Sequence, residues 1–127
     1  IDDTIDPRDH NLLAKLTKLM ETDKAYREPG LTIRKLSEML DTPEHRLRSL
    51  INQGLGYRNF SAFLNNYRIS ALKLEFQNPE KSRTPILTLA MDAGYNSLAP
   101  FNKAFRELEN MTPTAYRQKV LSDNEIV

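Results

Sequence analysis

The sequence predicts an all-α protein with two helix-turn-helix subdomains joined by a long linker helix, about seven helices in all. Three observations support this fold class. Apolar residues recur at helical spacing along the chain, no segment alternates apolar and polar residues as a strand does, and Gly or Pro separates the periodic segments. With 127 residues, the chain is long enough for one ordinary domain or two very small ones.

The first 30 residues predict an N-terminal linker followed by one helix. Residues 1–9 are acidic and aperiodic, which is typical of a linker or a frayed end. A helix is expected from about Arg8 to Lys24. Its apolar stripe consists of Leu12, Leu13, Leu16, Leu19 and Met20.

Residues 31–58 predict the first helix-turn-helix. Thr32 is placed to cap its first helix, and Asp41 lies in the turn. The second helix opens at Pro43 and is expected to stop at Gly54. The residues predicted to face inward are Ile33, Leu36, Met39, Leu40, Leu47, Leu50 and Ile51. The residues predicted to face out on the second helix are His45, Arg48, Ser49 and Asn52.

A long linker helix is predicted over residues 59–78. Asn78 and Pro79 end it, because a residue before proline disfavours helical geometry. Its broad apolar face could pack against both flanking parts of the chain. That face consists of Phe60, Phe63, Leu64, Tyr67, Ala71, Leu72 and Leu74.

Residues 84–120 predict the second helix-turn-helix and a closing helix. Thr84 is placed to cap the first helix, with Pro85 at the first helical position. Gly94 ends that helix, because glycine adopts the positive φ of a sharp turn at low cost. Ser97 is expected to cap the second helix, whose buried stripe is Phe101, Ala104, Phe105 and Leu108. Residues 121–127 are expected to form an acidic tail.

The two helix-turn-helix segments align with each other at an offset of about 53 positions. With a one-residue shift in the turn, the matched pairs are Ile33 with Ile86, Leu36 with Leu89, Ser37 with Ala90, Leu47 with Phe101 and Ile51 with Phe105. Two such units predict two recognition helices. Successive major grooves on one face of DNA are about 34 Å apart, a spacing that a rigid connecting helix could match.

The chain resembles the DNA-binding domain of the AraC/XylS family of bacterial transcription regulators. The resemblance covers roughly residues 8–120 and is strongest in PILTLAMDAGYNSLAPFNKAFRELENMTPTAYR. This stretch is similar to the family's pattern of a helix, Gly-aromatic, Ser, Phe-x-x-x-Phe and a final Thr-Pro-x-x-Tyr-Arg. Asp41 stands in the first turn where the family usually has Gly, although Asp tolerates left-handed geometry better than most residues.

The resemblance implies a sequence-specific DNA binder, often an activator, with two recognition helices in adjacent major-groove segments. The residues matched to the recognition helices are His45, Arg48, Ser49, Asn52, Leu98, Ala99, Asn102 and Lys103. Arg46 and Arg106 are added as candidate DNA contacts because they lie beside these residues, with phosphate as the favoured partner of Arg106. For Arg46 a phosphate contact and a purely surface position stay open. For His45 a base contact, a phosphate contact and a surface position all stay open. Leu98 and Ala99 can touch a thymine methyl group but cannot hydrogen-bond base edges.

Composition limits the other classes of function. Net charge is only +1, although residues 31–120 carry thirteen Lys/Arg against eight Asp/Glu. The absence of Cys excludes disulfides, thiolate zinc sites and cysteine nucleophiles. No nucleophile–base pair, metal set or phosphate-binding loop is visible, so we expect neither an enzyme nor a cofactor. The alternative function is a helical protein-interaction module without sequence-specific DNA binding.

The expected setting is cytoplasmic, with double-stranded promoter DNA as the partner and RNA polymerase as a further candidate. No apolar run approaches the roughly 20 residues that span a bilayer, so no membrane contact is expected of this segment. The sequence lacks an initiator Met. It is therefore predicted to be a fragment of a longer chain with an N-terminal sensor domain.

Overall fold

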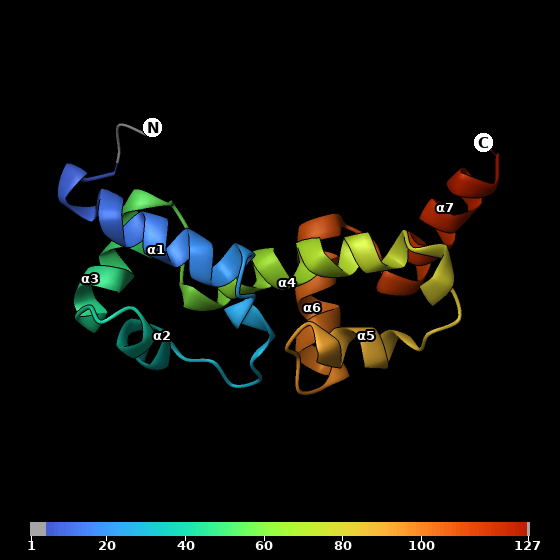
Figure 1. Cartoon of the computed structure of the whole chain (residues 1–127). Helices are drawn as coiled ribbons and strands as arrows, with labels where there is room; N and C mark the ends of the chain where they lie inside the picture. Colours follow the sequence, from blue (N-terminus) through green and yellow to red (C-terminus); the bar gives the residue numbers. More distant parts are fainter. Residues whose placement is uncertain (1–4, 127) are drawn as a thin grey trace. The chain divides into compact units, whose positions relative to one another are not determined.

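A computed structural model of the chain describes residues 5–126, with side chains described as far as Asp123. These residues contain seven α-helices and no strand, which confirms the predicted all-α class (Figure 1). The helices are α1 His10–Glu21, α2 Ile33–Met39, α3 Glu44–Ser49, α4 Phe60–Phe76, α5 Ile86–Asp92, α6 Leu98–Glu109 and α7 Pro113–Ile126. The shorter helical turns are η1 Pro7–Asp9, η2 Ala25–Arg27, η3 Leu50–Gly54 and η4 Pro79–Lys81.

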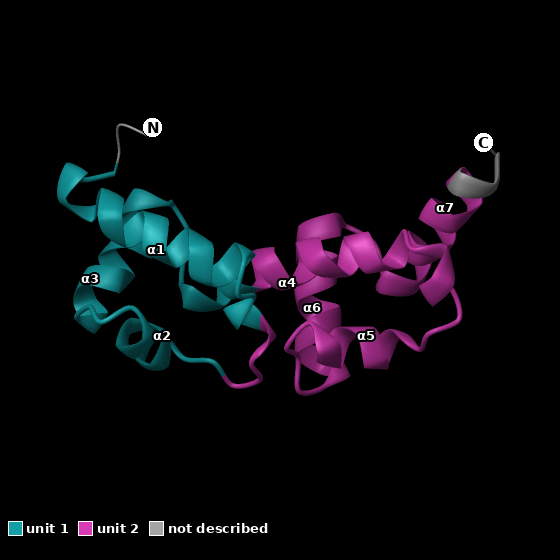
Figure 2. Cartoon of the chain, in the orientation of Figure 1, with its two compact units in different colours: residues 1–26, 31–64 teal, residues 27–30, 65–127 magenta. Residues whose placement is uncertain are grey.

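The chain divides into two compact units (Figure 2). Unit 1 contains residues 1–26 and 31–64, and unit 2 contains residues 27–30 and 65–127. The division falls inside α4, so this one helix contributes its first turn to unit 1 and its remainder to unit 2. Each unit contains one helix-turn-helix, α2–α3 in unit 1 and α5–α6 in unit 2.

The core of unit 1 includes a segment that the sequence pattern does not reveal. A linker or frayed end is the wrong prediction for residues 5–9, while residues 1–4 lie outside the described part of the chain. Ile5 is buried, and the Asp6 carboxylate accepts a hydrogen bond from the Arg8 backbone N–H at 2.9 Å, which caps η1. The buried residues of unit 1 are Ile5, Leu12, Leu16, Met20, Tyr26, Leu31, Leu36, Ser37, Leu40, Leu47, Leu50, Ile51, Gly54, Phe63 and Leu64.

An aromatic cluster forms the centre of unit 2. Phe105 is fully buried, and its ring centroid lies 5.8 Å from Phe76, 5.9 Å from Phe101 and 5.5 Å from Tyr116. The surrounding buried residues are Ile69, Leu72, Leu89, Ala90, Ala93, Tyr95 and Ala104. Because α4, α5, α6 and α7 all contribute to this cluster, it fixes how α6 is presented on unit 2.

The internal repeat is visible in the backbone of the two turns. Asp41 and Gly94 both have positive φ, +52° and +112°. The hydrogen bonds that close the two turns also correspond: Thr42 N–H to the Ser37 carbonyl at 3.0 Å, and Tyr95 N–H to the Ala90 carbonyl at 3.1 Å. Asp41 therefore adopts a positive φ as Gly94 does, and the two turns are closed by the same backbone hydrogen bond.

The helices that follow each helix-turn-helix start in the same way. The Asn59 side chain accepts from the Ala62 N–H at 2.8 Å at the start of α4, and Thr112 accepts from the Ala115 N–H at 3.1 Å at the start of α7. Four of the five matched pairs are buried in both units: Leu36 and Leu89, Ser37 and Ala90, Leu47 and Phe101, and Ile51 and Phe105. The units therefore share caps, turns and core positions.

Three residues predicted to be buried are exposed. Met39, Leu74 and Leu108 keep 47%, 69% and 46% of their surface. Leu74 follows Leu72 by two residues, about 200° round the helix, so it faces away from the core. Leu108 has the phase of the buried stripe but lies in the last turn of α6, where it is left uncovered. Met39 is the final residue of α2.

Several predicted helix ends also differ from the structure. Thr32 caps α2 as predicted, accepting from the Lys35 N–H at 3.1 Å. Thr84 does not cap α5, because Pro85 occupies the cap position. A separate C-terminal tail is the wrong prediction for residues 121–126, since α7 continues to Ile126, while Val127 lies outside the described part of the chain. η3 ends at Gly54, as predicted, although the residue with positive φ that follows it is Gly56.

Candidate nucleic-acid interface

The exposed face of unit 1 lies on α3 and its continuation η3. His45, Arg48, Ser49 and Asn52 are all exposed, as predicted. Their spacing of three, four and seven residues from His45 puts them on one side of the helix. The opposite side is buried through Leu47, Leu50 and Ile51. The face is therefore presented by a helix anchored in the core of unit 1.

The exposed face of unit 2 lies on α6 with the same spacing. Ala99, Asn102, Lys103 and Arg106 are exposed at intervals of three, four and seven residues from Ala99. Leu98, at the start of α6, is also exposed, at 41%. The structure thus gathers the predicted residues into two sets, one on each unit, and each set covers one helix face.

Two side chains on the unit 1 face have partners on their own helix. Arg48 Nη2 lies 3.7 Å from Glu44 Oε1, one helical turn away. Both side chains are half exposed, so this pair is weak and leaves the guanidinium available to another acceptor. The Ser49 hydroxyl lies 3.3 Å from Gln53 Oε1 and donates to it.

Arg46 is placed differently from the other candidates. Its Nε donates to Asp9 Oδ1 at 2.8 Å, and its Nη2 donates to the Arg8 carbonyl oxygen at 3.0 Å. The guanidinium is therefore engaged by the segment before α1. A DNA contact by Arg46 stays a prediction, and it would require this pair to open.

Sequence reasoning missed two polar residues that adjoin these faces. Gln53 is exposed beside Ser49 and is bonded to it. Ser97 occupies the N-cap of α6, but its side chain makes no capping hydrogen bond, so its exposed hydroxyl lies free at the start of the helix. Because Ser97 was predicted to cap the helix, its hydroxyl was expected to bond a backbone N–H, and it was therefore not considered as a DNA contact.

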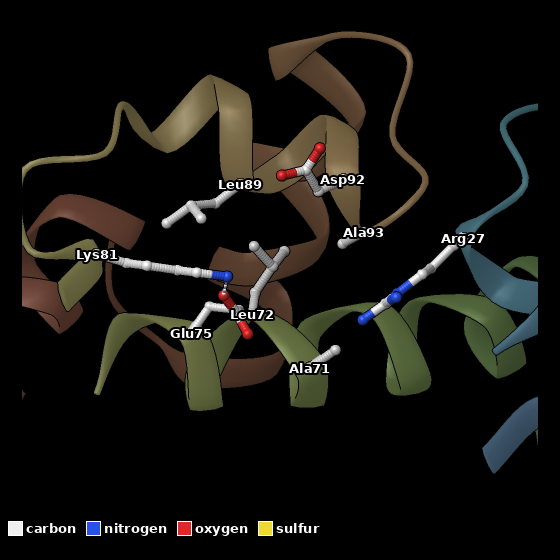
Figure 3. Close-up of a pocket in the computed structure, with 8 residues that line it drawn as sticks. All are labelled: Arg27, Ala71, Leu72, Glu75, Lys81, Leu89, Asp92 and Ala93. Carbon is white, nitrogen blue, oxygen red and sulfur yellow. Dashed lines mark hydrogen bonds and ion pairs between the residues drawn. The ribbon is translucent and has the colours of Figure 1, made fainter. Parts of the chain in front are cut away.

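A recess in unit 2 also gathers charged side chains (Figure 3). It has a volume of about 300 Å³ and is lined by Arg27, Ala71, Leu72, Glu75, Lys81, Leu89, Asp92 and Ala93. Lys81 and Glu75 form an ion pair inside it, and Arg27 points into it from the other end. Its two cations and two anions balance, so it shows no preference for a charged ligand. Among the described residues, no three His, Cys, Asp or Glu side chains gather as a metal ion would need.

Comparison with known proteins identifies the family. A family described as a helix-turn-helix domain, of the AraC type, matches residues 36–119, from within α2 to within α7. The chain belongs to this AraC-type helix-turn-helix family. Its members are DNA-binding transcription regulator domains rather than a class of enzymes. The matched residues contain both exposed faces.

Curated relatives of this AraC-type domain are named HTH-type transcriptional regulators. Those from Staphylococcus aureus strains MSSA476 and N315 are each 28% identical over 103 residues. These matches cover 81% of this chain and 13% of the relative. The chain therefore spans about an eighth of the length of these relatives.

Solved structures share the fold. The C-terminal domain of AraT, a response regulator from Geobacillus stearothermophilus, matches with a TM-score of 0.73 and 22% identity, over 85% of this chain and 84% of that one. The C-terminal domain of the two-component response regulator yesN from Fusobacterium nucleatum matches with a TM-score of 0.71 and 21% identity, over 84% and 98%. No helix in the described part of the AraC-type domain has the length and apolar character needed to cross a membrane.

Proposed function

We propose that the chain is a sequence-specific DNA-binding domain of a bacterial transcription regulator, and that its two recognition helices enter adjacent major-groove segments of a promoter. The observation that carries the proposal is the pair of exposed faces on α3–η3 and α6. Both have the same helical spacing, follow the same turn geometry and are backed by buried residues at matched positions. Such a helix fits the width of the major groove.

In unit 1, the exposed face has the chemistry for direct base readout. Arg48 is the side chain best suited to guanine, through a bidentate contact with O6 and N7. His45 and Asn52 flank it one turn away on either side and can bond base edges or phosphates. Ser49, tied to Gln53, adds a hydroxyl that can donate or accept.

In unit 2, the exposed face combines one base-reading side chain with backbone contacts. Asn102 can make a bidentate contact with adenine, while Lys103 and Arg106 are suited to phosphates. Leu98 and Ala99 offer apolar contact to a thymine methyl group. The free hydroxyl of Ser97 adds a polar group to this apolar start. We therefore expect unit 2 to contribute more to affinity than to base choice.

We further propose that the domain works as the C-terminal part of a longer regulator with an N-terminal sensor domain. The chain matches 13% of its curated relatives, and two of its structural neighbours are C-terminal domains of response regulators. RNA polymerase is the candidate partner of an activator, and binding to promoter DNA implies a cytoplasmic location. Pull-down of RNA polymerase with a promoter fragment that carries the bound protein tests the first of these. Binding of the protein to the promoter without recovery of RNA polymerase would refute activation by contact.

Selection of binding sites from random-sequence DNA tests the central proposal. The expected result is an enriched motif with two parts, each about half a helical turn long, separated so that both face one side of the duplex. Gel-shift titration of the enriched site against a scrambled duplex then gives the specificity ratio. Equal binding to both duplexes would refute sequence-specific recognition.

The alternative, a protein-interaction module, is favoured by one observation. Leu87 and Met91 are exposed one turn apart on α5, at 41% and 51%. The matched positions on α2 hold Arg34 and Glu38, which form an ion pair at 3.6 Å. Only unit 2 therefore has an apolar pair at this place. If no duplex shows preferential binding, this surface becomes the leading candidate for function.

A further inference from the structure

The segment before α1 contacts the first recognition helix near its start. Arg46 lies in the first turn of α3, and its guanidinium donates to the Asp9 carboxylate at 2.8 Å and to the Arg8 carbonyl at 3.0 Å. The Asp9 side chain is only 16% exposed, while that of Arg46 is 44% exposed. The carboxylate is therefore largely covered, and the ion pair ties residues 8–9 to α3.

The same segment contacts the far end of the recognition helix. A Cβ atom added to Gly54, the last residue of η3, would lie 3.6 Å from Ile5 Cγ1 and 3.1 Å from Leu50 Cδ1. Gly54 and Ile5 are both buried. Residues 5–9 therefore follow α3–η3 from its end to its start. They form a strap on the recognition helix, and we use that term for residues 5–9 below.

Arg46 occupies a position from which it could reach DNA. With 3.6 residues per turn, it lies about 100° round the helix from His45, between the exposed face and the buried Leu50. A long side chain at the flank of a groove-binding helix is well placed for the phosphates beside the groove. The ion pair with Asp9 instead directs the guanidinium along the strap and compensates its charge.

We infer that Asp9 is a positioning residue that withholds Arg46 from the DNA backbone, so that the strap limits sequence-independent binding by unit 1. The inference rests on the proposed function, since it assumes that α3 enters the major groove. A cation on a phosphate raises affinity for every sequence alike and steepens the salt dependence of binding. Holding one such cation away keeps more of the binding energy in contacts that distinguish bases.

Salt titration of DNA binding tests this inference on the full chain. The probe is a fluorescein-labelled scrambled duplex, read by anisotropy over a series of KCl concentrations. Asp9→Ala should tighten binding and increase the magnitude of the slope of log Kobs against log[KCl] by about 0.9, the value for one added phosphate contact. Asp9 makes no capping hydrogen bond on α1, so its removal does not uncap the helix.

Two more variants complete the cycle. Arg46→Gln alone should leave the slope unchanged, because Arg46 contacts no phosphate while Asp9 holds it. Asp9→Ala combined with Arg46→Gln should return to the wild-type slope. Asp23→Ala is the matched control: it removes an exposed acidic side chain of unit 1 and changes net charge equally, and we expect a much smaller effect on the slope.

Two results would overturn the inference. One is a slope reduced by about 0.9 in Arg46→Gln alone, which would mean that Arg46 already contacts a phosphate in the wild type. The other is equal behaviour of Asp9→Ala and Asp23→Ala, which would reduce the effect to overall charge. Circular dichroism would show whether Asp9→Ala folds. If it does not fold, the salt slope of Arg46→Gln alone still tests the inference. Failure of the proposed function looks different, since the wild type itself would then bind no duplex or show no preferred site.

Discussion

Asp41 and Gly94 occupy the same place in two turns of the chain and share a left-handed backbone, with φ of +52° and +112°. One position carries a side chain and the other does not. Left-handed geometry is costly for a residue with a Cβ atom, and Asp is among those that tolerate it best. Substitutions at the two positions can therefore show, within one protein, how much stability a helix-turn-helix gains from glycine in its turn.

We predict that Asp41→Gly stabilises unit 1. The substitution relieves the left-handed strain but adds backbone entropy to the unfolded chain, so the net gain should be about 0.5 kcal/mol. Urea denaturation followed by circular dichroism measures it. Asp41 is exposed, and its side chain has no hydrogen bond or ion pair with another residue in the described part of the chain, so a loss of stability would contradict the strain argument.

We predict that Gly94→Val destabilises unit 2. Gly94 is buried and has a φ of +112°, and a β-branched residue forced to positive φ costs about 1–3 kcal/mol. Gly94→Ala should cost less, because it lacks the branch. Thermal melting of the three proteins gives the order, and an unchanged melting temperature in Gly94→Val would show that the turn does not depend on glycine.

Phe105→Ala should cost roughly 3–5 kcal/mol, because it empties the centre of the aromatic cluster with Phe76, Phe101 and Tyr116. Leu108→Ala is the matched control on the same helix. Leu108 is 46% exposed, so its truncation should cost less than about 1 kcal/mol. Equal losses in denaturant titrations of the two variants would mean that the assigned packing of α6 is wrong.

Tyr95 should make the stability of unit 2 depend on alkaline pH. Its hydroxyl donates to Asn65 Oδ1 at 2.6 Å, and burial raises the pKa of the phenol well above its ordinary value of 10.0, although the nearby Arg68 guanidinium opposes this shift. The raised pKa means that the fold favours the neutral phenol. Its contribution is therefore complete below pH 10 and is lost as pH rises beyond that value.

Tyr95→Phe removes this ionisation and tests the assignment. Between about pH 9 and pH 11 the melting temperature of the wild type should fall more steeply than that of Tyr95→Phe. At neutral pH the variant should be less stable by about 1 kcal/mol, the usual contribution of one hydrogen bond. Parallel falls in the two proteins would assign the alkaline loss to other groups.

Arg48→Ala and Arg106→Ala should affect DNA binding in different ways. Arg48→Ala should relax preference at one or two base pairs, at a cost of about 1–3 kcal/mol in discrimination. Arg106→Ala should weaken all sites alike and reduce the magnitude of the salt slope by about 1. Binding measured on single-base variants of the selected site, across KCl concentrations, separates the two. The reverse pattern would exchange the roles assigned to α3 and α6.

Periodicity predicted the helices and the turns because each depends on residues close together in sequence. Gly94 with positive φ, the Thr32 cap and the buried Phe101 and Phe105 are all local consequences of residue type and spacing. The exposed candidate contact residues on α3 and α6 were predicted from the same helical phase, because they lie opposite the buried apolar residues. What they contact is untested, because that depends on the DNA rather than on the fold.

The errors lie where burial depends on a distant neighbour. Leu108 has the right phase, but the core ends before it. Ile5 lies in an acidic, aperiodic stretch, and only its contact beside Gly54 shows why it is buried. Arg68 is 8% exposed inside α4, with its guanidinium 5.3 Å from the Tyr95 ring centroid and a hydrogen bond to the Glu28 carbonyl. No local pattern predicts a buried cation of this kind.

The matched cores and unmatched faces of the two units affect how this domain can change. The face residues His45, Arg48, Ser49 and Asn52 stand where α6 has Ala99, Asn102, Lys103 and Arg106, while the residues beneath them are buried in both. A mutation on one face removes no buried contact, so it carries little penalty in folding. Under the proposed function, each unit could therefore change the half of the operator that it reads while the other unit keeps its contacts with the other half. Recognition by a duplicated scaffold would then evolve one half-site at a time.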